Sequence, residues 1–169
     1  QELVLGVGGV RVLDELSIEP EVWHLNEGHS ALLQIERMRV SAVNGGRDLQ
    51  AAVEEIRQNT VFTTHTPVPA GIDRFERSRI ERYFHAELLP GVDIQDILSL
   101  GAEADPNGFN MAHRGLRIAQ RANGVSKLHG EVSRGRFGDL WPGFDATEVP
   151  ITSVTTGVHA ATWTDSSME

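Results

Sequence analysis

The feature that most constrains the fold of this chain is the alternation of short β-rich runs with longer stretches of helical periodicity. Residues 22–25 (Val-Trp-His-Leu) and 60–64 (Thr-Val-Phe-Thr-Thr) are the clearest strand candidates, because they are apolar or β-branched and end at turn residues. Residues 149–156 suggest one more strand. Strands that alternate with helices are typical of a mostly parallel sheet, so we predict an α/β fold.

Helical periodicity fills most of the sequence between these runs, with Pro residues and Asn-Gly pairs at the breaks. The predicted helices are residues 1–16, 30–43, 48–58, 77–89, 94–101 and 109–136, the last with a break allowed at Asn123-Gly124. Three glycines in the first helix (Gly6, Gly8 and Gly9) predict that another backbone packs close to it. Three strands are few for a self-sufficient parallel sheet, which favours a helix-rich part of a larger domain.

The composition excludes several classes of partner. Twenty-four acidic residues against fifteen basic ones give a net charge of −9, which repels nucleic acid but is compatible with a neutral ligand such as a sugar. No segment approaches the ~18 consecutive apolar residues of a membrane span. The sequence has no cysteine, which fits a cytoplasmic protein. We therefore expect a cytoplasmic protein that binds neither nucleic acid nor a membrane.

Two polar motifs follow the two clearest strands. Asn26-Glu27-Gly28-His29 comes after the first strand, and Thr64-His65-Thr66 comes after the second. Because the carboxyl ends of parallel strands lie at one edge of a sheet, both motifs are predicted to face one pocket. Their amide, hydroxyl, carboxylate and imidazole groups suit a hydroxyl-rich ligand. The alternative is structural: Asn26 and Glu27 would cap the next helix, and His65 would be a satisfied, partly buried histidine.

A metal site is a second alternative. His24, His29, His65, His129 and Glu27 could in principle ligate zinc, as in a metal-dependent hydrolase. However, no predicted helix carries a His-x-x-x-His or Glu-x-x-His pair, and the sequence has no cysteine. We therefore expect no metal ligand in this chain.

Seven segments resemble, in order, the α-glucan (glycogen/maltodextrin) phosphorylases. They are residues 5–11 (LGVGGVR), 24–30 (HLNEGHS), 61–71 (VFTTHTPVPAG), 109–111 (FNM), 122–133 (ANGVSKLHGEVS), 140–144 (LWPGF) and 155–159 (TTGVH). The chain is most similar to the branch of this family that has Asn-Glu-Gly-His in place of Asn-Asp-Thr-His. The resemblance covers nearly the whole chain, and seven segments in the family's order are specific.

The resemblance implies part of a Rossmann-like domain in a two-domain, GT-B-type glycosyltransferase fold. Residues 1–157 would be the C-terminal portion of the N-terminal glucan-binding and catalytic domain, and residues 158–169 the start of the inter-domain connection, with the cofactor domain absent. The implied reaction transfers the non-reducing-end glucosyl unit of an α-1,4-glucan or maltodextrin to inorganic phosphate, giving α-glucose 1-phosphate. The implied cofactor is pyridoxal phosphate, and the implied parent is a homodimer.

The resemblance also implies roles for individual residues. His65 would be catalytic, with its backbone carbonyl and imidazole near the 6-hydroxyl region of the glucosyl unit. The implied substrate-binding residues are Asn26, Glu27, Gly28, His29, Thr66, Thr156 and Gly157.

Two departures from the family pattern limit these expectations. Thr156 stands where the family usually has an Asn that binds the sugar, and Thr cannot reproduce the donors and acceptor of an amide. The Gly-Thr-Ser-Gly-Met-Lys motif of the cofactor lysine is absent, and Lys127, the one lysine, lies in a predicted helix. We therefore expect no cofactor-binding residue in this chain, and an inactive chain. The alternative function is that of a non-catalytic, glucan-binding, glycosyltransferase-like module.

Overall fold

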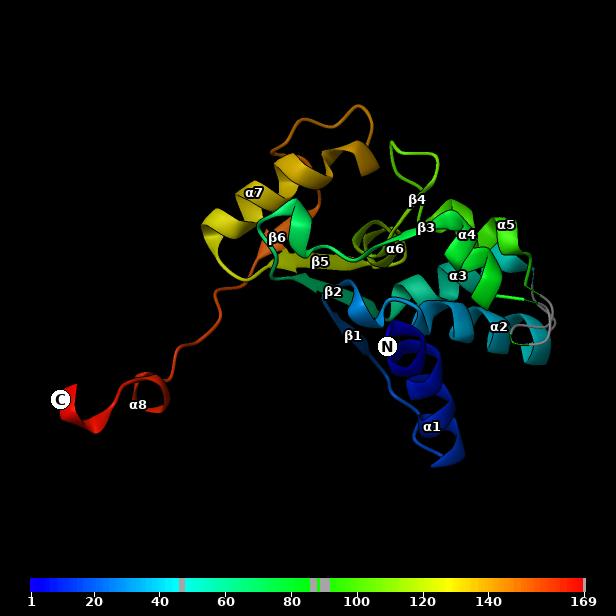
Figure 1. Cartoon of the computed structure of the whole chain (residues 1–169), viewed down its shortest axis with the longest axis horizontal. Coiled ribbons are helices and arrows are strands. Elements are labelled where there is room, and N and C mark those ends of the chain that lie inside the picture. The colour runs from blue at the N-terminus through cyan, green and yellow to red at the C-terminus, as the bar shows by residue number, and fades with distance from the viewer. Residues whose placement is uncertain (46–47, 86–87, 89–91, 169) are drawn as a thin grey trace.

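A four-stranded parallel sheet forms the centre of the protein in a computed structural model, which describes residues 1–45, 48–85, 88 and 92–168 (Figure 1). Its strands, in spatial order, are β1 (Trp23–Asn26), β2 (Thr60–Thr64), β5 (Arg121–Gly124) and β6 (Ile151–Ser153). All neighbouring pairs run parallel. The predicted α/β fold with a few parallel strands is therefore confirmed.

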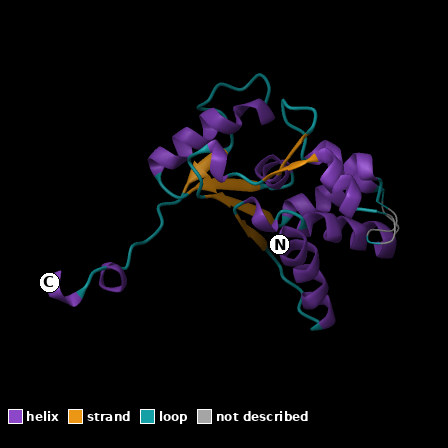
Figure 2. Cartoon of the chain, viewed as in Figure 1, coloured by secondary structure: helices purple, strands orange, loops and turns teal. Residues whose placement is uncertain are grey.

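Helices pack against this sheet and make up most of the ordered structure (Figure 2). The α-helices are α1 (Gly9–Glu15), α2 (Leu33–Gly45), α3 (Leu49–Gln58), α4 (Arg77–Tyr83), α5 (Ile94–Leu100), α6 (Met111–Arg117), α7 (Lys127–Phe137) and α8 (Ala160–Trp163). A π-helical turn, η1 (Val4–Gly8), leads into α1, and 3-10 turns occupy η2 (Gly28–Ser30), η3 (Pro69–Gly71), η4 (Gly138–Leu140) and η5 (Ser166–Met168). Two further strands, β3 (Arg74–Glu76) and β4 (Gly108–Asn110), form a separate antiparallel pair that the sequence did not predict.

The strand order follows the order of the strands in the sequence. Because crossovers between parallel strands are almost always right-handed, such an order puts the crossover helices on one face of the sheet. That face carries Leu25, Phe62, Ala122 and Ile151, all buried. The opposite face carries the exposed His24, Asn26, Arg121 and Thr152, and is continued past the end of β2 by the exposed His65. The same face also carries the partly buried Val61 and Asn123 and the buried Thr63. The sheet thus has one apolar, covered face and one mainly polar, more open face.

The predicted helix over residues 1–16 is confirmed, as a π-turn followed by α1. A Cβ atom added to Gly6 would lie 2.7 Å from the backbone nitrogen of Leu33, so two backbones do pack closely here. An added Cβ at Gly9 would meet no atom within 4 Å, and one at Gly8 would meet only the Val4 side chain at 4.0 Å. The predicted close packing therefore holds for Gly6 alone.

The predicted helical region over residues 109–136 is confirmed for α6 and α7, but the break allowed at Asn123-Gly124 is a strand, which the sequence did not predict. This stretch contains the end of β4, then α6, the inner strand β5, and α7. Arg-Ala-Asn-Gly has no β-branched or aromatic residue to indicate a strand, and β5 is held by its pairing with β2 and β6 on either side. Tertiary hydrogen bonding thus decides the conformation of residues 121–124.

Other helix and strand boundaries shift by a few residues. Helix α2 begins three residues later than predicted and runs to Gly45, and β6 is shorter than the predicted run 149–156. Helix α4 ends at Tyr83 instead of continuing through the predicted segment 77–89, of which residues 86, 87 and 89 lie outside the described residues.

The segment after β6 leaves the body of the molecule and ends in α8 and η5 (Figure 1). Its apolar side chains are exposed, with Val158 at 84% and Trp163 at 82%. In the described residues, no helix is both long enough and apolar enough to cross a membrane.

Candidate functional site

The polar residues that follow β1 and β2 meet at one edge of the sheet. The backbone N–H of Glu27 donates to the carbonyl oxygen of Thr63 at 2.8 Å, which continues the pairing of the two strands beyond Asn26. The Asn26 Oδ1 atom is hydrogen-bonded to His65 Nε2. The two motifs, far apart in the sequence, therefore lie side by side.

Glu27 joins the two motifs a second time. Its Oε2 atom accepts a hydrogen bond of 3.0 Å from the backbone N–H of His65. The side chain is 6% exposed, and within the described part of the chain its Oε1 atom has no hydrogen-bond partner. The backbone has φ 69° and ψ −177°, a conformation that only glycine adopts readily and that costs about 1–3 kcal/mol. A strained backbone thus holds a buried carboxylate against His65.

This geometry differs from the structural alternative in two details. Glu27 occupies the N-cap position of η2 but its side chain makes no capping hydrogen bond. His65 is exposed instead of partly buried. Because Asn26 Oδ1 can only accept, His65 Nε2 must carry the proton, which leaves Nδ1 as the acceptor of the neutral ring. An acceptor on an exposed ring beside a buried carboxylate suits a ligand that carries hydroxyl groups.

The neighbouring predicted residues have mixed environments. His29 Nδ1 is 2.6 Å from Asp73 Oδ2, so this ring is tied to the segment that follows η3. A Cβ atom added to Gly28 would lie 2.9 Å from the Cβ of Met111, so glycine permits the close approach of α6. Thr66 packs its methyl group where a Gly71 side chain would otherwise begin, with 2.6 Å between the methyl carbon and an added Cβ. Asp73 was not predicted from the sequence, because only the fold brings it to His29.

The last two predicted residues lie apart from this group. Thr156 and Gly157 are exposed on the segment that follows β6. The backbone N–H of Thr156 donates to the carbonyl oxygen of Val125 at 3.0 Å, which anchors the segment to the loop between β5 and α7. Within the described ranges, neither residue is hydrogen-bonded to Asn26, Glu27 or His65.

The histidines considered as metal ligands do not converge. In the described part of the chain, no three His, Asp or Glu side chains are placed to hold a metal ion. His24 is bonded to Thr63, with 2.7 Å between Nε2 and Oγ1, while His29 pairs with Asp73. His129 is buried between α7 and β5, where its Nδ1 would lie 2.8 Å from a Cβ added to Gly124.

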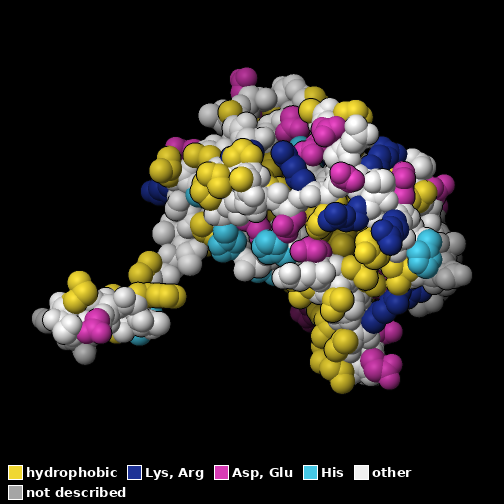
Figure 3. Space-filling view, in the orientation of Figure 1, with side chains coloured by type: hydrophobic (Ala, Val, Ile, Leu, Met, Phe, Trp, Pro, Cys, Tyr) yellow, Lys and Arg dark blue, Asp and Glu magenta, His cyan; other side chains and the backbone are white. Residues whose placement is uncertain are grey.

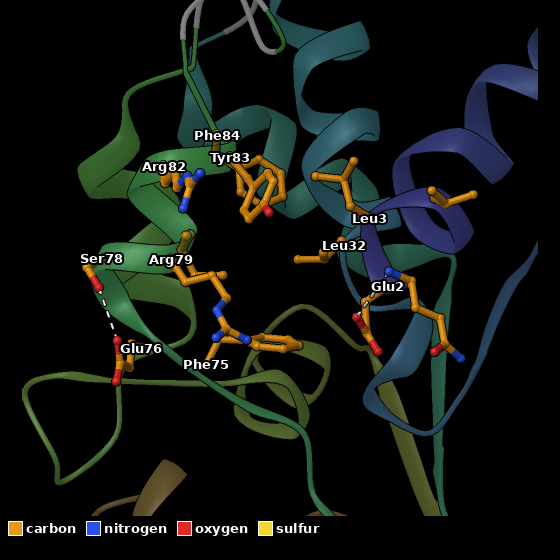
Figure 4. Close-up of a pocket in the computed structure, with 13 residues that line it drawn as sticks. Glu2, Leu3, Leu32, Phe75, Glu76, Ser78, Arg79, Arg82, Tyr83 and Phe84 are labelled. Atoms are coloured by element: carbon orange, nitrogen blue, oxygen red, sulfur yellow. Dashed lines mark hydrogen bonds and ion pairs between the residues drawn. The ribbon is translucent and has the colours of Figure 1, made fainter.

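A large hollow lies elsewhere on the surface. It has a volume of about 750 Å³ and opens between the N-terminal turn and α4 (Figure 4). Leu3, Leu32, Phe75 and Tyr83 give it an apolar lining, and Arg79 and Arg82 lie along one side. None of the predicted site residues lines it. In the space-filling view, histidine and acidic side chains gather over the middle of the molecule, and several basic side chains lie over the α4 region (Figure 3).

No protein-family model matches this chain. Individual relatives do. The chain is 54% identical over 175 aligned residues to a protein named glycogen phosphorylase from Mycobacterium tuberculosis. It is 42% identical to a maltodextrin phosphorylase from Thermococcus litoralis and 36% identical to a glycogen phosphorylase from Aquifex aeolicus. Each alignment covers 96% of this chain.

The chain spans only a fraction of each relative, namely 20%, 19% and 23% of their respective lengths. The parallel α/β sheet fits part of a GT-B-type domain. Identity of this level over nearly all of the chain leads to one conclusion: this chain belongs to the glycogen and maltodextrin phosphorylase family.

Proposed function

We propose that this chain is part of an α-glucan phosphorylase. The parent polypeptide transfers the non-reducing-end glucosyl unit of an α-1,4-glucan or maltodextrin to inorganic phosphate and releases α-glucose 1-phosphate. The observation that carries the proposal is the group formed by Asn26, Glu27 and His65 at the carboxyl edge of the sheet, in a sequence 54% identical to a protein named glycogen phosphorylase.

In this proposal the chain supplies part of the glucosyl site. Glu27 and Asn26 fix the main chain and the ring of His65, so that His65 Nδ1 accepts from the 6-hydroxyl of the sugar. The carbonyl dipole of His65 near the anomeric carbon would stabilise positive charge that develops as the glycosidic bond breaks. Gly28, His29 and Thr66 line the same pocket, and Thr156 and Gly157, at the end of the glucan-binding domain, would approach it in the complete parent.

The cofactor chemistry is assigned to another part of the parent. Pyridoxal phosphate requires a lysine in an enclosed pocket, and its phosphate group would supply acid-base chemistry to inorganic phosphate. Lys127 does not fit this role, because it is exposed at the first position of α7. In this arrangement residues 1–157 belong to the glucan-binding domain, residues 158–169 begin the connection, and the parent is a cytoplasmic homodimer.

The test is phosphorolysis of maltoheptaose in the presence of orthophosphate and pyridoxal phosphate, followed as glucose 1-phosphate. We expect no product from this chain and rapid turnover by the full-length parent. In the parent, His65→Ala keeps the backbone carbonyl but removes the imidazole that accepts from the 6-hydroxyl, so we expect kcat/KM to fall about tenfold, the effect of losing one hydrogen bond. Product from the purified chain would contradict the assignment of the cofactor to another domain.

A second candidate is a glucan-binding module without catalysis, which is favoured by Thr156 at the position of the family's sugar-binding Asn. A parent that binds maltoheptaose but makes no glucose 1-phosphate would support this candidate. Thr156→Asn separates the two cases further, because it should raise turnover in an enzyme and only affinity in a module.

A further inference from the structure

The open face of the sheet carries a row of polar side chains that crosses all four strands. Asn26, Thr63, Asn123 and Thr152 occupy matching register positions in β1, β2, β5 and β6. Parallel strands in the middle of a sheet are normally apolar on both faces. Here the two inner strands contribute a hydroxyl and a carboxamide, so this row needs an explanation.

A directed chain of hydrogen bonds runs along the row. Thr63 Oγ1 donates its one proton to Asn123 Oδ1, at 2.9 Å. The bond between Thr63 Oγ1 and His24 Nε2, at 2.7 Å, must therefore be donated by the histidine. It follows that His24 carries its proton on Nε2 and that Thr63 holds the Asn123 carboxamide with its oxygen toward β2.

In this orientation the amino group of Asn123 makes fewer hydrogen bonds than the two it can donate. Its Nδ2 atom donates only one long bond, of 3.3 Å, to the neighbouring carbonyl oxygen of Gly124. The side chain is half-buried on the open face. The second N–H of this amino group therefore has no acceptor among the described residues. Carboxamide donors in folded proteins are normally hydrogen-bonded, so this N–H is available to a ligand.

Asparagine is also a poor residue for an inner strand, because its side chain favours turns over extended structure. A residue that breaks a local rule at the edge of a candidate site is more often there for binding than for folding. The position is close to that site. His65 lies two residues after Thr63 in the same chain direction, so it is the diagonal neighbour of Asn123 on the adjacent strand.

We propose that Asn123 is a further ligand-binding residue of this site, where its free Nδ2–H donates to a hydroxyl of the sugar unit held by His65. Thr63 and His24 are positioning residues, because they fix the carboxamide in the orientation that turns its donor to the ligand. The identity of the ligand as an α-1,4-linked glucose unit rests on the proposed function. The row of hydrogen bonds from His24 through Thr63 to Asn123 does not depend on that identity.

The experiment is a titration of the full-length parent with maltoheptaose in the absence of orthophosphate, with the unfolding midpoint measured for each variant. Asn123→Ala is expected to raise the Kd about tenfold, the effect of losing one buried hydrogen bond. Thr63→Val is expected to raise it several-fold, and Thr63→Ser to restore it. Thr152→Ala is the matched control: it removes a hydroxyl of the same row whose bond goes to the Ala122 carbonyl, and it should leave the Kd unchanged.

A readout without sugar tests the positioning residues. The ring ¹⁵N spectrum of His24 should show the Nε2–H form in the unmodified chain and in Thr63→Ser, and a mixture of tautomers in Thr63→Val. If Asn123→Ala leaves the Kd for maltoheptaose unchanged while His65→Ala raises it, the inference is overturned and the proposed function stays intact. A full-length parent that binds no maltoheptaose at all would overturn the glucosyl site in these residues and the inference with it.

Discussion

The Glu27 carboxylate accepts a hydrogen bond from the backbone N–H of His65, with 3.0 Å between Oε2 and the nitrogen. This bond joins the loops after β1 and β2 at the point where the polar motifs meet. It requires the Glu27 backbone to adopt φ 69°, a value that favours glycine. Local strain and the placement of His65 are therefore coupled through one side chain.

Replacement of Glu27 separates these two contributions. Both Glu27→Ala and Glu27→Gly remove the acceptor of the His65 N–H, but only glycine relaxes the backbone. We expect Glu27→Gly to be more stable than Glu27→Ala by about 1–2 kcal/mol in urea unfolding. Amide hydrogen exchange at His65 should accelerate in both variants. Equal stabilities of the two variants would show that the backbone at position 27 is not strained.

Gly6 and Gly9 form a matched pair within one continuous helical segment. Gly6→Ala would push a Cβ to 2.7 Å from the Leu33 nitrogen, so we expect the free energy of unfolding to fall by about 1–3 kcal/mol. Gly9→Ala meets no atom within 4 Å and should raise it by about 0.5–1 kcal/mol, because alanine favours helix. Thermal unfolding of both variants checks the prediction, which fails if the two shifts have the same sign.

Glu36 should make stability depend on acid pH. Burial alone would raise the pKa of its carboxyl, but hydrogen bonds from Arg11 and Arg39 outweigh burial and lower it. Because the pKa is lower in the folded state, the ionised carboxylate stabilises the fold. This stabilisation is fully present above the unfolded-state pKa of about 4.3 and is lost as the pH falls through the folded-state pKa. Glu36→Gln should therefore cost about 1–3 kcal/mol at pH 7, and the difference from the unmodified chain should shrink below pH ~4.

Glu54→Gln is the control for this prediction. Glu54 forms an exposed pair with Arg57, with 2.9 Å between the charged atoms, and such pairs contribute about 0–1 kcal/mol. A pH-independent effect of Glu36→Gln in urea unfolding would contradict the ionic origin of the stabilisation.

Arg114 is expected to destabilise the fold. Its guanidinium is completely buried and, among the described residues, Nε, Nη1 and Nη2 have no hydrogen-bond partner. Burial lowers its pKa to about 9. Arg114→Leu should raise the free energy of unfolding by about 1–4 kcal/mol, since it removes an uncompensated buried charge. Because the unfolded chain holds this proton more tightly, the stability of the unmodified chain should rise with pH above about 9.

Arg117 lies on the same helix and provides the comparison. Its Nη1 donates to the Leu100 carbonyl at 2.8 Å, so Arg117→Leu should lower stability instead of raising it. If Arg114→Leu also unfolds at a lower denaturant concentration than the unmodified chain, the guanidinium has a stabilising partner in the folded protein.

Local signals in the sequence predict the parts of the fold that depend on local interactions. The runs around Leu25 and Phe62 are apolar or β-branched and form β1 and β2 near the predicted boundaries. Strand β5 has no such signal, and its conformation depends on partners that lie about 60 residues before and 30 residues after it in the sequence. The antiparallel pair of β3 and β4 was missed for the same reason.

The candidate site also contains residues that local sequence indicates and residues that only the fold brings together. Turn chemistry after two strands indicated Asn26, Glu27 and His65, and the fold brings these three residues together. The bond between His29 and Asp73 and the chain from His24 through Thr63 to Asn123 depend on strand register and loop placement. No short motif encodes such relationships, so sequence patterns could not reveal them.

The order of the strands has a consequence for biosynthesis. In the four-stranded sheet, β2, β5 and β6 each pair with the edge left free by the strand of this sheet made before them, and none inserts between two strands that are already paired. A nascent chain can therefore extend the sheet from its N-terminal side as residues leave the ribosome, without undoing earlier pairing.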